Sequence, residues 1–196
     1  MPTSLIPRPL VRLAAFGLLA GLTACEGLTS IDASFQNITT VDTVYALNHG
    51  PPGSPNAIKL FDGLVARADQ GFGYDVAFDI DEDGNVVFIP VRALATTFSS
   101  PYSVALQSAD GSFASLLEAP KDGYRADTSM TVPVGKTVVI ESRDFQGACA
   151  FSLKGQSYFS KLVVTDIDPV LRRLVFTVTV NRNCGFRSFA PGIPEN

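Results

Sequence analysis

Apolar and polar residues alternate most clearly in the middle of the chain. In residues 74–80, every second residue is a large apolar one and the residues between are small or acidic, which is the period of a half-buried β-strand. An acidic turn over 81–85 leads into a second apolar stretch, 86–94, which contains Pro90. Proline lacks a backbone N–H, so Pro90 predicts an edge position or a bulge. The two stretches together predict a β-hairpin.

Similar short apolar stretches, separated by Gly, Pro and Asp, recur along the chain. They predict strands near residues 34–38, 43–48, 57–61, 64–68, 102–107, 125–132, 136–142, 158–166 and 171–181. Only 112–119 has a pattern compatible with a helix, and that helix would last barely two turns. Many short strands with turn residues between them are typical of a β-sandwich. We therefore expect an all-β fold: a single antiparallel sandwich, Ig-like or jelly-roll-like, with little helix.

The first 25 residues have a different organisation. Arg8 and Arg12 precede an apolar run, 13–22, without any acidic residue. This run is about half of the roughly 20 residues that a membrane-spanning helix needs. A basic start, a short apolar segment and a small-residue exit are typical of a secretory signal.

The export segment ends in Leu22-Thr23-Ala24-Cys25, which resembles the lipobox of bacterial lipoproteins. The resemblance covers only this segment, and an ordinary signal peptide is the alternative. It implies thioether lipidation of Cys25, cleavage after Ala24 and acylation of the new N-terminus. Several acyl chains hold a protein on a bilayer far more firmly than one. An Asp directly after the lipidated cysteine would favour retention in the inner membrane. This chain has Glu26 there, which favours the outer membrane if the cell is Gram-negative.

Three regions are therefore expected in the chain. Residues 1–24 are a lipoprotein signal peptide, 25–40 are the lipidated N-terminus and a tether, and 41–196 are the β-sandwich domain. We expect a cell-envelope protein whose partner is the lipid bilayer, reached through acylated Cys25, with an envelope protein as a further, unidentified partner.

The charge of the mature chain bears on its partners. The full chain carries 15 Lys and Arg and 19 Asp and Glu. Removing residues 1–24 takes away two arginines and no acid, which leaves 13 basic and 19 acidic residues and a net charge near −6. This acidic balance argues against binding to nucleic acid and against an electrostatic attraction to anionic lipid.

The cysteines fit an exported protein. Once Cys25 is lipidated, Cys149 and Cys184 are the only two left. An oxidising compartment favours a disulfide between them; two free thiols, or a metal-binding pair that lacks further ligands, are the alternatives.

The hairpin turn is the candidate metal site. Asp79, Asp81 and Asp83, followed by Gly84, match the opening of a calcium loop, in which alternating carboxylates wrap a hard cation. The full motif requires a Glu at its twelfth position, where this chain has Pro90. A plain turn is the alternative reading, and apart from calcium no cofactor is expected.

We assign no catalytic residue. Gly155 and Ser157 begin like a nucleophile elbow, but Phe159 replaces the closing glycine. The single histidine, His49, is the only imidazole that could activate Ser157. The leading hypothesis is a non-catalytic binding or structural domain. The alternatives are a calcium- or small-ligand-binding module centred on 74–94 and a hydrolase that uses Ser157 or the hairpin acids.

Overall fold

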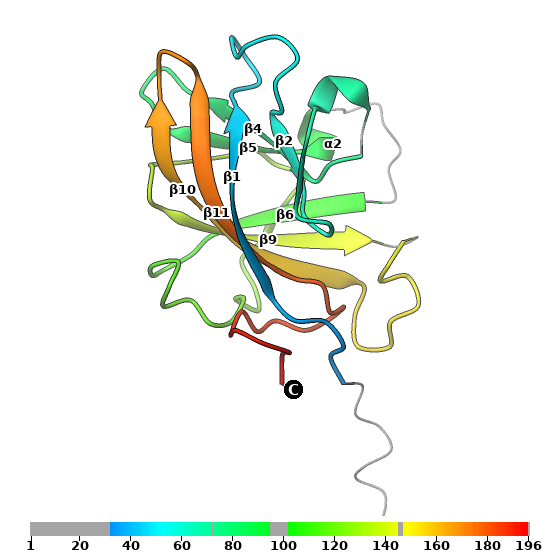
Figure 1. Cartoon of the computed structure of the whole chain (residues 1–196). Helices are drawn as coiled ribbons and strands as arrows, with labels where there is room; N and C mark the ends of the chain where they lie inside the picture. Colours follow the sequence, from blue (N-terminus) through cyan, green and yellow to red (C-terminus); the bar gives the residue numbers. More distant parts are fainter. Residues whose placement is uncertain (1–31, 72, 95–101, 145–146, 196) are drawn as a thin grey trace, which may run out of the picture. The chain divides into compact units, whose positions relative to one another are not determined.

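Eleven strands form two antiparallel sheets in the part of the chain that the computed structural model describes, residues 32–71, 73–94, 102–144 and 147–195 (Figure 1). The six-stranded sheet has the order β1-β11-β10-β9-β6-β7, and the five-stranded sheet has the order β3-β2-β4-β5-β8. The predicted all-β sandwich with little helix is confirmed. Eleven strands in this order exceed the seven to nine strands of Ig domains and the eight of a jelly roll.

The strands are β1 (Ile38–Tyr45), β2 (Ala57–Lys59), β3 (Leu64–Ala66), β4 (Val76–Ile80), β5 (Val86–Pro90), β6 (Tyr102–Ser108), β7 (Arg125–Ala126), β8 (Met130–Val132), β9 (Thr137–Asp144), β10 (Ser157–Asp168) and β11 (Arg173–Asn181). Helical structure in the described residues is limited to one 3-10 turn, η1 (Ala68–Gln70), and one short helix, α2 (Val91–Leu94). No helix in this part of the chain is long and apolar enough to span a bilayer.

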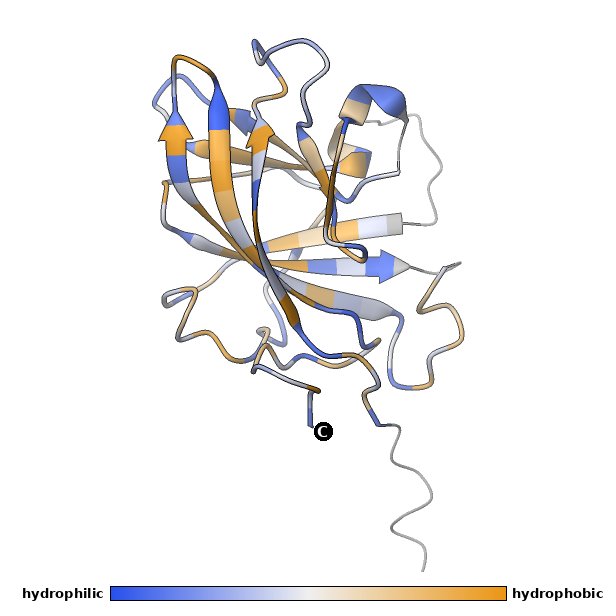
Figure 2. Ribbon diagram, in the orientation of Figure 1, coloured by the Kyte–Doolittle hydropathy of each residue, from blue (hydrophilic) through white to orange (hydrophobic). Residues whose placement is uncertain are grey.

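The main hydrophobic core lies between the two sheets. Figure 2 shows hydrophobic segments along β4, β10 and β11, where the sheets face each other. Phe78 of β4 is fully buried between Phe88 of its own sheet and Phe176 of β11, with ring centroids 5.4 Å away in both cases. Close aromatic pairs of this kind add to the stabilisation that comes from burial alone. Phe78 therefore links the two sheets at the centre of the core.

Strand β4 is more buried than its alternation predicted. All five of its residues are buried, including Asp79, whose carboxylate accepts from Asn48 in the loop after β1 and from Arg172. In that loop the backbone N–H of Leu47 donates to the carbonyl of Phe78 over 2.8 Å. Pro90 lies at the end of β5, beyond the residues that pair with β8. β5 lies between β4 and β8, so Pro90 is not in an edge strand as expected, but at the end of β5 it interrupts no pairing with β8.

Four expected elements differ from the structure. The two strands expected at 34–38 and 43–48 are one strand, β1, and the strand expected at 86–94 ends at Pro90, after which α2 begins. Residues 112–119 form no helix: the Ser112 and Ser115 hydroxyls bond to each other and to nearby backbone groups, a local pattern that competes with helix formation.

The stretch expected as one strand over 125–132 is divided between the sheets. β7 belongs to the six-stranded sheet and β8 to the five-stranded sheet. Asp127 lies between them with a φ of 50°. Its carboxylate accepts hydrogen bonds from the Ser103 hydroxyl and the Val104 N–H, both at 3.2 Å. These bonds hold the chain where it crosses from one sheet to the other.

The compact unit includes part of the expected tether. It runs from Asp32, whereas the sequence placed the start of the domain at residue 41. Asn183 explains the difference, because its side-chain oxygen accepts from the backbone N–H groups of Ser34 (2.8 Å) and Phe35 (2.9 Å) and its amide donates to the Phe35 carbonyl (2.8 Å). The chain is therefore attached to the sandwich before β1 begins.

The predicted disulfide is confirmed. Cys149 and Cys184 are joined across a sequence separation of 35 residues, with their Cα atoms 5.5 Å apart. The bond connects the loop before β10 to the segment after β11. The disulfide thereby fixes the loop before β10 to the segment after β11, in which Asn183 binds the backbone of Ser34.

Replacing both cysteines, as Cys149→Ser with Cys184→Ser, should lower the free energy of unfolding by about 3–4 kcal/mol, because the open loop gains chain entropy in the unfolded state. Urea denaturation of the wild type and the double variant measures this difference. An unchanged midpoint and slope would show that the bond contributes nothing to stability.

Candidate functional site

The outer face of the six-stranded sheet carries a second, smaller core. Residues 109–126 and the C-terminal segment 183–195 lie over this face, opposite the main core. The buried residues of the second core are Ala109, Ala119, Val139, Phe159 and Phe189. Because β10 is buried on both faces from Tyr158 to Val164, the sheet is covered on both sides along this strand.

A buried lysine of β10 binds the 109–126 segment that lies over the sheet. Lys161 of β10 is 4% exposed, and its Nζ donates to the carbonyls of Phe113 (2.6 Å) and Leu116 (2.9 Å). The ammonium also lies 4.5 Å from the centroid of the Phe113 ring, a favourable cation–π distance. Burial lowers the pKa of Lys161. These contacts attach the 109–126 segment to the sheet.

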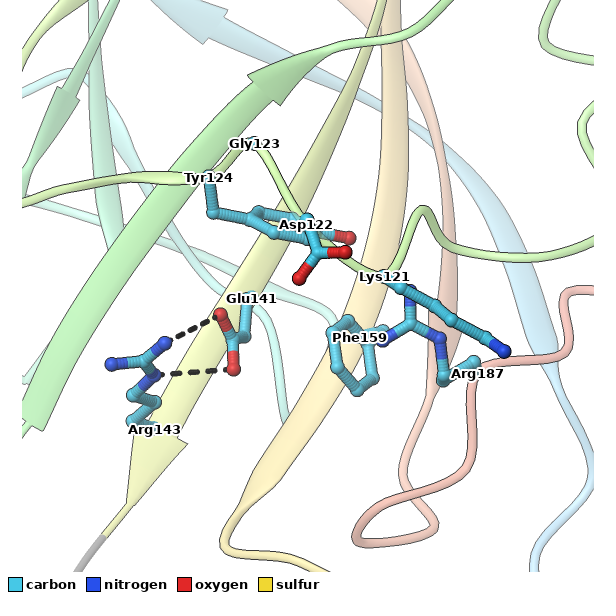
Figure 3. A pocket seen from close by; sticks show the side chains of 8 residues that line it. All are labelled: Lys121, Asp122, Gly123, Tyr124, Glu141, Arg143, Phe159 and Arg187. Carbon is cyan, nitrogen blue, oxygen red and sulfur yellow. Dashed lines mark hydrogen bonds and ion pairs between the residues drawn. The ribbon is translucent and has the colours of Figure 1, made fainter.

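A pocket of about 220 Å³ remains where the cover is incomplete (Figure 3). Strands β9 and β10 supply its floor, the loop before β7 supplies one wall and the C-terminal segment supplies the other. Its lining residues are Lys121, Asp122, Gly123, Tyr124, Glu141, Arg143, Phe159 and Arg187. Charged side chains from three separate parts of the chain thus meet over one surface of the sheet.

Glu141 is the central acid of the pocket. It is 9% exposed, and its two oxygens accept a pair of 3.1 Å hydrogen bonds from the Arg143 guanidinium. The Ser157 hydroxyl donates to Glu141 Oε1 over 2.7 Å. The hydrogen bond to Glu141 raises the pKa of Arg143 further. Both oxygens of the carboxylate are therefore already engaged by the chain itself.

The opposite side of the pocket is aromatic and cationic. Arg187 lies with its guanidinium carbon 5.1 Å from the centroid of Phe159. Tyr124 packs 6.2 Å from the same ring, and its buried hydroxyl has no hydrogen-bond partner among the described residues. Burial raises the pKa of this phenol, so Tyr124 stays protonated. With exposed Lys121 nearby, this side suits a small polar ligand that carries an acceptor or a negative charge.

The expected calcium site is not formed. The described residues contain no group of three or more His, Cys, Asp or Glu side chains that could hold a metal ion. Asp79 points away from the turn: its Oδ1 accepts from Arg172 over 3.0 Å, and its Oδ2 accepts from the Asn48 amide. Asp81 closes the turn by accepting from the N–H groups of Asp83 (3.0 Å) and Asn85 (2.7 Å). The carboxylates of Asp79, Asp81 and Asp83 therefore form no such group in this structure.

The structure also separates Ser157 from His49. His49 follows Asn48, whose carbonyl accepts from Arg172 Nε over 3.3 Å beside the β10–β11 turn. Ser157 begins β10 and lies eleven residues before Asp168 at the other end of that strand. At about 3.3 Å per residue, Ser157 lies roughly 36 Å from Asp168 along the strand, whereas His49 is near the Asp168 end. The two side chains do not form the dyad that the hydrolase alternative required.

One further hairpin acid, Asp75, is buried between the sheets. Its Oδ2 accepts from the Leu60 N–H over 2.7 Å, and its Oδ1 accepts from the Tyr158 hydroxyl over 3.0 Å. Burial raises the pKa of Asp75 above the ordinary carboxylic value, and these hydrogen bonds oppose the rise only in part. Asp75 therefore connects β10 to the five-stranded sheet and is not available to solvent.

Cys25 lies outside the described residues, so its lipidation stays a prediction. Sequence reasoning did not identify the pocket. The one signal in the sequence that could have found it is in β9. Val139, Glu141 and Arg143 occupy alternate positions, so they lie on the same face of this strand. Charges on one face of an otherwise apolar strand indicate a functional or covered surface, but the residues that cover it come from distant loops.

No family model, no curated protein and no solved structure matches this chain.

Removing the Asp79 carboxylate should destabilise the fold. We expect Asp79→Ala to lower the free energy of unfolding by about 1–3 kcal/mol, because Arg172 and Asn48 lose a nearly buried partner. Exposed Asp83, as Asp83→Ala, is the matched control and should cost little. Thermal melting with and without millimolar calcium measures both effects. A calcium-dependent rise in melting temperature that both substitutions abolish would contradict this account.

Asp75 should make stability depend on pH. Its pKa is higher in the folded chain than in the unfolded chain, so the stability it contributes is fully present below about pH 4, the unfolded value, and is lost as the pH rises through the folded value. The free energy of unfolding of the wild type, relative to that of Asp75→Asn, should therefore decrease from about pH 4 upwards. Urea denaturation over a pH series tests this. A difference that is constant or grows with pH would contradict it.

Proposed function

We propose that this chain is a lipoprotein of the bacterial cell envelope, anchored by acyl chains on Cys25, whose β-sandwich acts by binding or by structural contact. The observation that carries the proposal is the Leu22-Thr23-Ala24-Cys25 segment followed closely by a folded unit. That unit starts at Asp32, so only a few residues separate the acylated cysteine from the domain. A short connection of this kind holds a domain near a membrane surface.

The disulfide supports an exported location. Disulfides form and persist in oxidising compartments and are rare in the bacterial cytosol. The bond between Cys149 and Cys184 joins the only two cysteines that a lipidated chain would leave free. Two independent features, the export segment and the disulfide, thus favour the same compartment.

A binding role is supported by the pocket on the outer face of the six-stranded sheet. The pocket is polar, and Glu141 in its lining is held by hydrogen bonds from Arg143, which also lines the pocket, and from Ser157, which lies beside it. Preorganised polar groups around a concavity are typical of sites that bind small molecules. This site replaces the 74–94 hairpin as the location for a small-ligand-binding alternative.

The anchor is tested by Cys25→Ser. We expect this variant to leave the membrane fraction, because it lacks the acyl chains that hold the mature protein on the bilayer. Thr23→Ser keeps the pattern of the export segment and is the matched control, which should stay membrane-bound. Fractionation of cells expressing each protein, followed by detection of the chain, gives the result. A Cys25→Ser protein that stays in the membrane fraction as strongly as the control would contradict acyl anchoring.

A further inference from the structure

Two large apolar side chains are almost completely exposed in the loop before β10. Phe151 is 96% exposed and Leu153 is 90% exposed. Figure 2 shows the hydrophobic segments of this loop at the edge of the structure, away from both cores. Large apolar side chains are costly to leave in water. Neighbouring exposed apolar residues often mark a surface that contacts a partner.

This loop is fixed at the end of the domain where the chain enters. Cys149, two residues before Phe151, is bonded to Cys184. The residue next to Cys184 is Asn183, which holds the backbone of Ser34. The base of the loop is closed by a 2.7 Å hydrogen bond from the Gly185 N–H to the Ser157 carbonyl. The exposed pair and the entry point therefore lie at one end of the sandwich.

Other half-exposed apolar residues belong to the same end. Phe35, Leu117 and Ile193 are each 52–55% exposed. Phe35 is held by Asn183, and the Leu117 carbonyl accepts from the Phe189 N–H over 2.7 Å. Ile193 follows Gly192, which pairs with Asn37 in an isolated bridge. Figure 1 shows this entry segment, the loop before β10 and the C-terminal segment at the same end.

The length of chain before the domain limits how an anchored domain can be oriented. Nine residues lead from Cys25 to Ser34 and can span at most about 30 Å when fully extended. The opposite end of the domain, at the β10–β11 turn, lies about 36 Å away along β10. An anchored domain can therefore rest its entry end on the bilayer easily, whereas resting only the far end on it would need more chain than is present.

We propose that the loop over residues 147–155 contacts the lipid bilayer, with Phe151 and Leu153 entering its interfacial region. This inference rests on the proposed acyl anchor. The mature chain is acidic, so anionic lipids do not attract it. The contact is instead made by the apolar side chains, and a neutral phosphatidylcholine surface is sufficient. Apolar groups at an interface are buried about 5–10 Å into the headgroup and acyl boundary.

The absence of tryptophan from the chain gives a direct test. Phe151→Trp introduces a single tryptophan into the loop, and Val170→Trp introduces one at the β10–β11 turn. Val170 is 88% exposed, so the two sites are matched in exposure and differ in the end of the domain on which they lie. Each lipidated protein is purified from membranes and reconstituted into phosphatidylcholine vesicles, with or without bromine atoms on the acyl chains.

We expect the emission of Phe151→Trp to shift to shorter wavelength in vesicles and to be quenched by the brominated lipid, and that of Val170→Trp to do neither. If the protein floats with the vesicles but Trp at 151 is not quenched, the anchor stands and the loop contact is wrong. A blue shift that depends on protein concentration, without quenching, would identify a second copy of the chain as the partner and overturn the bilayer contact. Failure to float with vesicles would overturn both proposals.

Discussion

Asn183 stands next to the disulfide and holds the backbone of the chain as it enters the sandwich. Its amide bonds to Ser34 and Phe35 and also to Asn181, over 2.9 Å. Asn181 is fully buried and donates to the carbonyls of Phe186 and Ser188. A few side-chain amides thereby bind the N-terminal segment, the end of β11 and the C-terminal segment to one another. This network sets the end of the domain from which the chain leads towards Cys25, and it places the disulfide-bonded loop there.

The second constraint comes from β10, which is buried on both faces. The five-stranded sheet covers one face, and among the described residues no second sheet covers the other. The chain covers that face with the 109–126 segment and the C-terminal segment, and Lys161 fastens the first of these through backbone carbonyls. Irregular segments match a sheet less closely than strands do. The pocket around Glu141 lies where this cover leaves a gap, so the candidate binding site follows from how the sheet is covered.

The sequence predicted the fold class, most strands and the cysteine pair, because alternation along strands and pairing of the last two cysteines are local or compositional signals. It did not predict that the 125–132 stretch changes sheets at Asp127, since the partners that hold Asp127 are some twenty residues earlier in the chain. The acids of the hairpin suggested calcium for a similar reason: the sequence gives their spacing but not Arg172, the distant partner of Asp79. The pocket and the amide network depend on contacts between residues that are far apart in sequence, and for these the sequence has no periodic signal.

The proposal on which the others depend is that the mature chain begins with an acylated Cys25 at a membrane surface. The most direct measurement is mass spectrometry of the N-terminal peptide of the protein recovered from the membranes of its own cells. The account predicts a peptide that starts at Cys25 and carries the added mass of a diacylglyceryl group and an acyl chain. A peptide that retains residues 1–24, or one that starts elsewhere with an unmodified Cys25, would contradict it.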